Sequence, residues 1–231
     1  MLVLLVSLLL FIVLSTFFDR SLVLALLFTL ILLSAVSAAS GSRNGMIGAW
    51  LLGLPFLASI WISLGTASPV AGWATIILGA LLLSYTTGIV LRHVMWARDV
   101  DAEVLFGAAA VYLLIGLTFA MLCLLVELAA PGSFTNLTFL ADGKPDIDAM
   151  IYYSFVTLAT LGYGDITPTW DVPRTLAVIE AVLGVFYTTI LVGRLVSVYT
   201  ARAMIKYQDD LIEAEDAPDT HSPDVPRGEE A

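Results

Sequence analysis

Long apolar runs, separated by charged residues, glycine or proline, are the feature of this sequence that most constrains its fold. Hydrophobic residues make up 59% of the 231 residues and charged residues only 13%, and the mean hydropathy is +0.95. A helix needs about 20 apolar residues to cross a hydrocarbon core of about 30 Å, and inside lipid every backbone polar group must be paired within the protein. The runs therefore predict an all-α integral membrane protein.

Six such runs predict six transmembrane helices. The first has no basic residue before it and no small-residue cleavage pattern after it, so we interpret it as a retained helix and not as a secretory signal. Basic residues are more numerous on the side that would carry both chain ends, which predicts a multi-pass cell-membrane protein with cytoplasmic N- and C-termini, although Arg20 opposes this orientation. The runs cover approximately residues 1–17, 21–40, 47–64, 72–96, 103–130 and 172–203.

The segment between the fifth and sixth runs differs from the rest of the chain. Residues 131–145 are polar and rich in turn formers, and residues 146–160 are amphipathic but too short to cross the membrane. This segment must therefore enter the membrane and return on the same side, as a short re-entrant helix and a loop. Asp146 or Asp148 suits the N-terminus of the short helix, where the helix dipole favours an acidic side chain.

The loop after the short helix carries the chemistry of the sequence, in the residues Thr160-Leu161-Gly162-Tyr163-Gly164-Asp165. Positive φ angles are accessible mainly to glycine, so alternate glycines allow the backbone to alternate between right- and left-handed conformations. Such a backbone can direct consecutive carbonyl oxygens toward one axis, where they replace the water around a cation. The Thr160 hydroxyl adds an oxygen, and Tyr163 can point away from the axis to support the loop.

From Glu103 to Tyr199, and most densely from Tyr152 to Asp165, the sequence resembles the pore region of potassium channels of the bacterial, six-span kind. The resemblance rests on the Thr-x-Gly-Tyr-Gly-Asp motif, with a short helix before it and a long apolar helix after it. It implies a selectivity filter in which Thr160, Leu161, Gly162 and Tyr163 bind K⁺ and Gly164 completes the loop. Leu161 stands where the family usually carries valine or isoleucine, but its backbone carbonyl is unchanged.

One loop cannot surround an ion, and the motif occurs once in this chain. Geometry and the family resemblance together therefore imply a homotetramer with a tetrameric pore on its symmetry axis. The predicted domains are a four-helix membrane domain (residues 1–102), a pore domain with outer helix, pore helix, filter and inner helix (residues 103–205), and an acidic, disordered cytoplasmic tail (residues 206–231).

Several residues are candidates for supporting the filter. In this family the acid after the filter often accepts a hydrogen bond from the pore helix, so Asp165 is expected to pair with Tyr152 or Tyr153. Val156 stands where some bacterial relatives carry a glutamate that pairs with this acid, so that support is missing. Glu180 lies inside the sixth run, where an ionisable group is costly unless it faces protein or water.

We expect Glu180 to lie behind the filter, hydrogen-bonded to the pore helix with Thr157 as a candidate partner, and proton sensing is the alternative. Glu127, near the outer end of the fifth run, is expected at the membrane interface. In the sixth run Gly184 is interpreted as a hinge of the inner helix, with close helix packing as the alternative. Thr188 is expected to line the inner cavity, and Thr189 is its rival.

Voltage sensing requires about three to four charges per subunit that move through the membrane field. The fourth run offers only Arg92 and Arg98, which are also explained as anchors on the cytoplasmic side. The sequence therefore predicts a channel that is not voltage-gated, and His93 is interpreted as a solvated interfacial residue.

No paired catalytic carboxylates, activated nucleophile, phosphate-binding glycine loop or cluster of metal ligands occurs in the sequence, so no enzyme activity is expected. Cys123 is interpreted as a buried structural thiol. The expected partners are further copies of the chain, membrane lipid and K⁺ as the permeant ion, with no other cofactor and no nucleic acid. The alternative functions are a non-conducting regulatory or structural channel subunit and a weakly selective cation channel.

Overall fold

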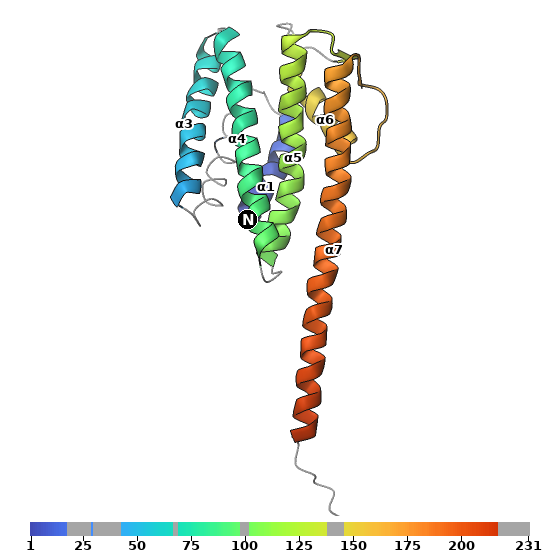
Figure 1. The fold of residues 1–231 in the computed structure, drawn as a ribbon. Coiled ribbons are helices and arrows are strands. Elements are labelled where there is room, and N and C mark those ends of the chain that lie inside the picture. Colours follow the sequence, from blue (N-terminus) through green and yellow to red (C-terminus); the bar gives the residue numbers. More distant parts are fainter. Residues whose placement is uncertain (18–28, 30–42, 67–68, 98–101, 138–145, 217–231) are drawn as a thin grey trace, which may run out of the picture. The chain divides into compact units, whose positions relative to one another are not determined.

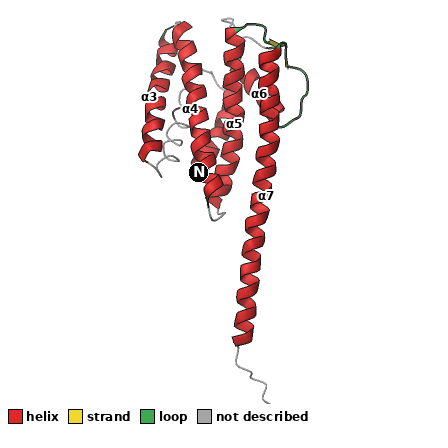
Figure 2. Ribbon diagram, viewed as in Figure 1, coloured by secondary structure: helices red, strands yellow, loops and turns green. Residues whose placement is uncertain are grey.

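The computed structural model describes residues 1–17, 29, 43–66, 69–97, 102–137 and 146–216, and almost all of these are helical (Figure 2). The predicted second span therefore lies outside the described residues, apart from Thr29. The helices, labelled as in Figure 1, are α1 (Leu2–Phe17), α3 (Arg43–Gly65), α4 (Pro69–Trp96), α5 (Ala102–Ala129), α6 (Ile147–Leu158) and α7 (Asp171–Asp216). A short antiparallel pair is formed by β1 (Phe134–Thr135) and β2 (Thr167–Pro168).

Four of the described helices are long and apolar enough to cross a membrane. Their apolar stretches coincide with the third to sixth predicted spans and run over Gly45–Ser63, Val70–Trp96, Ala102–Ala129 and Asp171–Val198. The apolar stretches Leu2–Phe11 of α1 and Ile147–Leu158 of α6 are shorter. The short length of α6 agrees with the prediction that this segment does not cross, while the six-span layout and the re-entrant path remain predictions.

Helix α5 is the centre of the packing in residues 1–191. It contacts α1, α4 and α6, while α3 packs against α4. The largest buried cluster joins α1, α4 and α5, with Leu8, Phe11, Val90 and Leu114 all fully buried. These helices are apolar on every side, so the placement of polar residues does not determine which face is buried. Small residues, which let two helices approach closely, determine it instead.

Gly116 shows how a small residue of α5 admits the neighbouring helix α6. A Cβ atom at Gly116 would lie 2.7 Å from the Phe155 ring of α6, closer than real Cβ contacts allow. The aromatic ring therefore rests on the backbone of α5. This contact holds α6 against α5, and in Figure 1 α6 is seen beside α5.

The chain divides into two compact units, residues 1–191 and residues 192–231. In the second unit the structure describes only the C-terminal part of α7, which continues to Asp216. Residues 208–216 are therefore helical, whereas the sequence predicts disorder from residue 206. The reason is that no glycine or proline occurs between Gly193 and Pro218 to end the helix. The predicted domain boundaries at residues 102 and 205 remain predictions.

Candidate functional site

The short helix α6 begins and ends with identifiable caps. The Asp146 side chain accepts a hydrogen bond from the Asp148 backbone N–H at 3.1 Å, so Asp146 is the N-cap, one of the two residues that the sequence predicts for this end. Asp148 lies in the first turn and adds a second acid there. Ala159 is the C-cap. The C-terminal end of the α6 dipole, which favours a cation, therefore points to the loop that begins at Thr160.

The loop after α6 alternates in backbone handedness. Gly162 has φ = 56° and Gly164 has φ = 79°, as the sequence predicts for these two positions. A Cβ atom on either glycine would meet nothing within 4 Å, so conformation and not space requires glycine here. Thr160 also has a positive φ of 56°, which sequence reasoning did not predict. A non-glycine residue in this region costs about 1–3 kcal/mol, and such strain is common at functional sites.

Backbone hydrogen bonds show which way the start of this loop faces. The N–H groups of Leu161 and Gly162 donate to the Val156 carbonyl oxygen at 2.9 and 3.4 Å, and the N–H of Thr160 donates to the Thr157 oxygen at 2.9 Å. In a planar trans peptide the carbonyl points opposite to the N–H of the next residue. The carbonyl groups of Ala159, Thr160 and Leu161 therefore all point away from α6. Consecutive carbonyls on one side are what a cation-binding backbone needs.

Tyr152 of α6 supports the outer end of the loop. Its hydroxyl donates to Asp165 Oδ2 at 2.7 Å, and its ring stacks on Tyr163 with the ring centroids 6.5 Å apart. The hydrogen bond raises the pKa of Tyr152 to about 12 and lowers the pKa of Asp165. At neutral pH the phenol therefore keeps the proton that it donates, and Asp165 carries a negative charge beside the loop.

Tyr153, the other candidate donor, has a different role. Its ring is buried and packs edge-on against Phe134, with the centroids 5.1 Å apart. The structure therefore assigns the bond with Asp165 to Tyr152. Thr157 is the partner of Glu180 that the sequence suggests, but the recorded partner of Glu180 on α6 is Ser154.

The strand pair fixes the segments on both sides of α6 and the loop. Phe134 pairs with Pro168 and Thr135 with Thr167, and the Asn136 side chain donates to the Asp165 carbonyl at 2.9 Å. Sequence reasoning missed this element because two residues per strand leave no alternating pattern to recognise.

Glu127 anchors the turn that leads from α5 into β1. Its two carboxylate oxygens accept the N–H groups of Gly132 at 2.8 Å and Phe134 at 3.1 Å. Glu127 is only 1% exposed. It is buried because the turn after α5 leaves backbone N–H groups without partners in the helix, and a carboxylate can satisfy two of them at once. Its expected position at the membrane interface remains a prediction.

Glu180 of α7 is fully buried, and its Oε1 atom is hydrogen-bonded to Ser154 of α6. Glu180 therefore contacts α6, but through Ser154 and not through Thr157; its role behind a filter remains a prediction. Ser154 Oγ also lies 2.6 Å from the carbonyl oxygen of Gly116 in α5. These three residues connect α7, α6 and α5 behind the loop.

Gly184 of α7 lies directly against the end of α6. A Cβ atom at Gly184 would collide with the backbone oxygen of Leu158, so the two elements meet backbone to backbone. This contact favours the packing interpretation of Gly184, and the hinge remains a prediction. Thr188 and Thr189 are exposed in the single chain, and both hydroxyls donate to carbonyls of their own helix. Because both side chains are exposed and make the same kind of hydrogen bond, these observations do not show which of the two lines a cavity.

The described residues contain no group of three or more His, Cys, Asp or Glu side chains that could hold a metal ion. Cys123 is a buried free thiol, as the sequence predicts. Arg92 and His93 are exposed near the C-terminal end of α4.

Residues 109–201 match a protein-family model described as an ion channel. The matched range contains most of α5, both short strands, α6 with its loop, and α7 as far as Ala201. Searches among curated proteins and among solved structures found no match. Two of the four membrane-length apolar helices, α5 and α7, lie largely within the matched range. Residues 109–201 are therefore similar to an ion channel domain, in a chain with four helices that are long and apolar enough to cross a membrane.

Proposed function

We propose that this chain is a subunit of a homotetrameric, potassium-selective channel that conducts K⁺ passively and is not voltage-gated. The observation that carries the proposal is the left-handed backbone at Thr160, Gly162 and Gly164, together with the loop carbonyls that point away from α6. Backbone carbonyl oxygens from Thr160 to Tyr163, with the Thr160 hydroxyl, would replace the hydration shell of K⁺. We propose no resident cofactor and no catalytic step.

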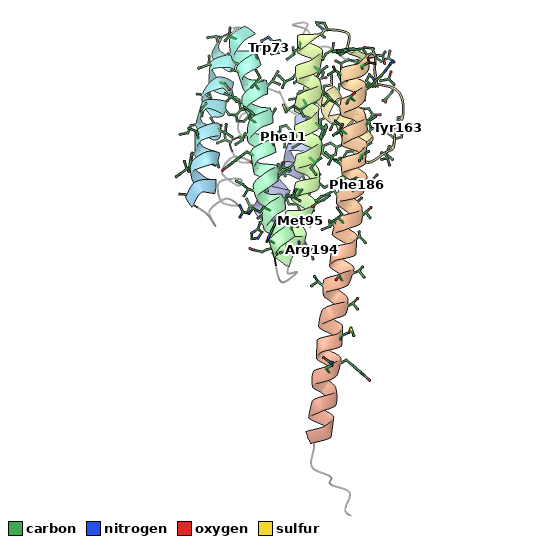
Figure 3. The ribbon with its side chains drawn as sticks, viewed as in Figure 1. Phe11, Trp73, Met95, Tyr163, Phe186 and Arg194 are labelled. Atoms are coloured by element: carbon green, nitrogen blue, oxygen red, sulfur yellow. The ribbon has the colours of Figure 1, made fainter. Side chains whose placement is uncertain are left out.

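The exposed surfaces of a single chain support assembly. Leu161 is 56% exposed and Tyr163 on the same loop is 66% exposed (Figure 3), although both belong to the element that would line the pore axis. Helix α7 also leaves a series of large apolar side chains uncovered, among them Phe186 (Figure 3). Three further copies around the loop would cover such surfaces and close the ring of carbonyls. The exposed residues on this helix include Val178, Ile179, Val182, Leu183, Val185, Phe186 and Ile190.

Ion flux from liposomes that contain only this protein tests the proposal. We expect K⁺ to leave K⁺-loaded vesicles rapidly and Na⁺ to leave matched vesicles much more slowly. Equal K⁺ and Na⁺ fluxes would favour the weakly selective cation channel. No flux from correctly assembled protein would favour the non-conducting subunit.

Gly162→Ala is the most specific variant for this assay. Alanine at φ = 56° is strained by about 1–2 kcal/mol, and the loop would relax away from the alternating conformation. We expect loss of selective K⁺ flux while the tetramer still forms. The matched control is Gly72→Ala in α4, because a Cβ atom there meets nothing within 4 Å and the backbone is helical. Wild-type selectivity in Gly162→Ala would refute a role of this backbone conformation.

A further inference from the structure

At the buried contact between Glu180 and Ser154, the Ser154 hydroxyl faces more acceptor oxygens than it has protons to donate. Ser154 and Glu180 are both 0% exposed. Ser154 Oγ is within hydrogen-bonding distance of two oxygens, the Gly116 carbonyl at 2.6 Å and Glu180 Oε1. A serine hydroxyl has one proton to donate, a carbonyl oxygen has none, and an ionised carboxylate has none.

An ionised Glu180 would leave one of these two short contacts without a proton. Two oxygens held at 2.6 Å with no proton between them repel each other, because both direct lone pairs at the contact. A second proton removes the conflict, and Glu180 is the only one of the three groups that can carry it. We propose that Glu180 is a neutral carboxylic acid that donates to Ser154, while Ser154 donates to the Gly116 carbonyl.

The surroundings of Glu180 agree with a neutral acid. Its Oε2 atom is buried without a hydrogen-bond partner, and an unpartnered neutral oxygen is far less costly than an unpartnered charged one. Among the described residues, no Arg, Lys or His forms an ion pair with this carboxyl group. The titratable groups that interact electrostatically with it are Tyr112 and Cys123 of α5 and Tyr153 of α6, and none of these can supply a positive charge.

The direction of the hydrogen-bond chain gives Glu180 a positioning role. The chain runs from α7 through Ser154 in the middle of α6 to the backbone of α5. If Glu180 lost its proton, Ser154 would have to turn its hydroxyl toward the carboxylate and release the Gly116 carbonyl. The helix that carries the filter loop is therefore held from both sides only while Glu180 is protonated. The consequence for conduction rests on the proposed function, whereas the protonation state does not.

Infrared spectroscopy tests the protonation state without any measurement of flux. Protein labelled with ¹³C at the glutamate side-chain carboxyl should show the carbonyl stretch of a protonated carboxylic acid at neutral pH. We expect this band to be missing in Glu180→Gln and present in Glu103→Gln, a control at an exposed glutamate of α5. Identical spectra for wild type and Glu180→Gln would overturn the proposal even if the channel conducts.

The pH profile and a conservative rescue test the positioning role. Glutamine can donate its amide N–H to Ser154 and cannot ionise, so Glu180→Gln should retain the thermal stability of the tetramer, whereas Glu180→Ala should lower it. Wild-type flux should be lost as the pH becomes alkaline, and the flux of Glu180→Gln should not. The same alkaline loss in both proteins would overturn the role of Glu180. Wild-type protein that shows the infrared band but no flux would instead refute the proposed function alone.

Discussion

Tyr152 holds the outer end of the loop through two separate contacts. Its hydroxyl binds Asp165, and its ring stacks on Tyr163. The side chain at position 156 cannot help, because valine has no polar group that could reach Asp165. The recorded hydrogen bond to the Asp165 side chain within one chain therefore comes from Tyr152. Asn136 donates only to the backbone carbonyl of Asp165.

Tyr152→Phe separates these two contacts. The variant keeps the stacked ring but loses the hydrogen bond, so the pKa of Asp165 should rise toward its ordinary value and the outer loop should be held less firmly. We expect K⁺ current to inactivate faster in planar bilayer recordings. Tyr153→Phe is the matched control, because the Tyr153 ring packs against Phe134 and the hydrogen bond to Asp165 comes from Tyr152. Equal inactivation of wild type and Tyr152→Phe would contradict this role of the hydroxyl.

The sequence predicts the conformation of an individual residue only where a single residue type can adopt that conformation without strain. Gly162 and Gly164 could be predicted because glycine alone adopts positive φ without strain. Thr160 could not, because positive φ is uncommon for a β-branched residue and nothing in the sequence marks this exception. The choices between Tyr152 and Tyr153, and between Ser154 and Thr157, depend on the rotation of α6. That rotation is determined by Phe155 against Gly116, a contact between segments distant in the sequence.

At the scale of elements, α7 meets the end of α6 backbone to backbone, just before the loop that begins at Thr160. Gly184 faces the Leu158 backbone, and Tyr187 one turn later donates to the Ala108 carbonyl of α5 at 2.6 Å. Hydropathy predicts where the long helices lie in the sequence, because each of the four is a run long and apolar enough to cross a membrane. It does not predict the strand pair, or that Glu127 is buried, because both arise from the turns that connect the helices.

Gly184→Ala distinguishes packing from a hinge. The new methyl group would meet a backbone carbonyl that cannot rotate away, and such overpacking costs about 1–3 kcal/mol. The packing interpretation predicts a lower midpoint of thermal unfolding for the tetramer in detergent. The control is Gly88→Ala, where a helical Cβ meets nothing within 4 Å. Unchanged stability with altered open probability would support the hinge instead.

At the scale of the whole molecule, the distribution of charge bears on whether the proposed channel can sense voltage. A charge that crosses the whole membrane field gains about 2.3 kcal/mol per 100 mV. Of the two arginines predicted for the fourth span, the structure describes Arg92, which is exposed near the C-terminal end of α4. Arg98 lies outside the described residues. A single arginine near the end of a membrane helix can move through only a small part of the membrane field.

We therefore expect a shallow relation between conductance and voltage in planar bilayer recordings of the wild-type protein. Arg92→Gln should leave the slope of that relation unchanged, because the side chain anchors the end of α4 and does not move through the membrane. Lys at this position keeps the charge, so Arg92→Lys is the control for effects on assembly. A steep relation in the wild type that becomes shallow in Arg92→Gln but not in Arg92→Lys would identify α4 as a voltage sensor. A shallow relation in all three proteins would agree with the absence of a voltage sensor in α4. Lipid or membrane tension would then be the next stimulus to test, by reconstitution in bilayers of different thickness.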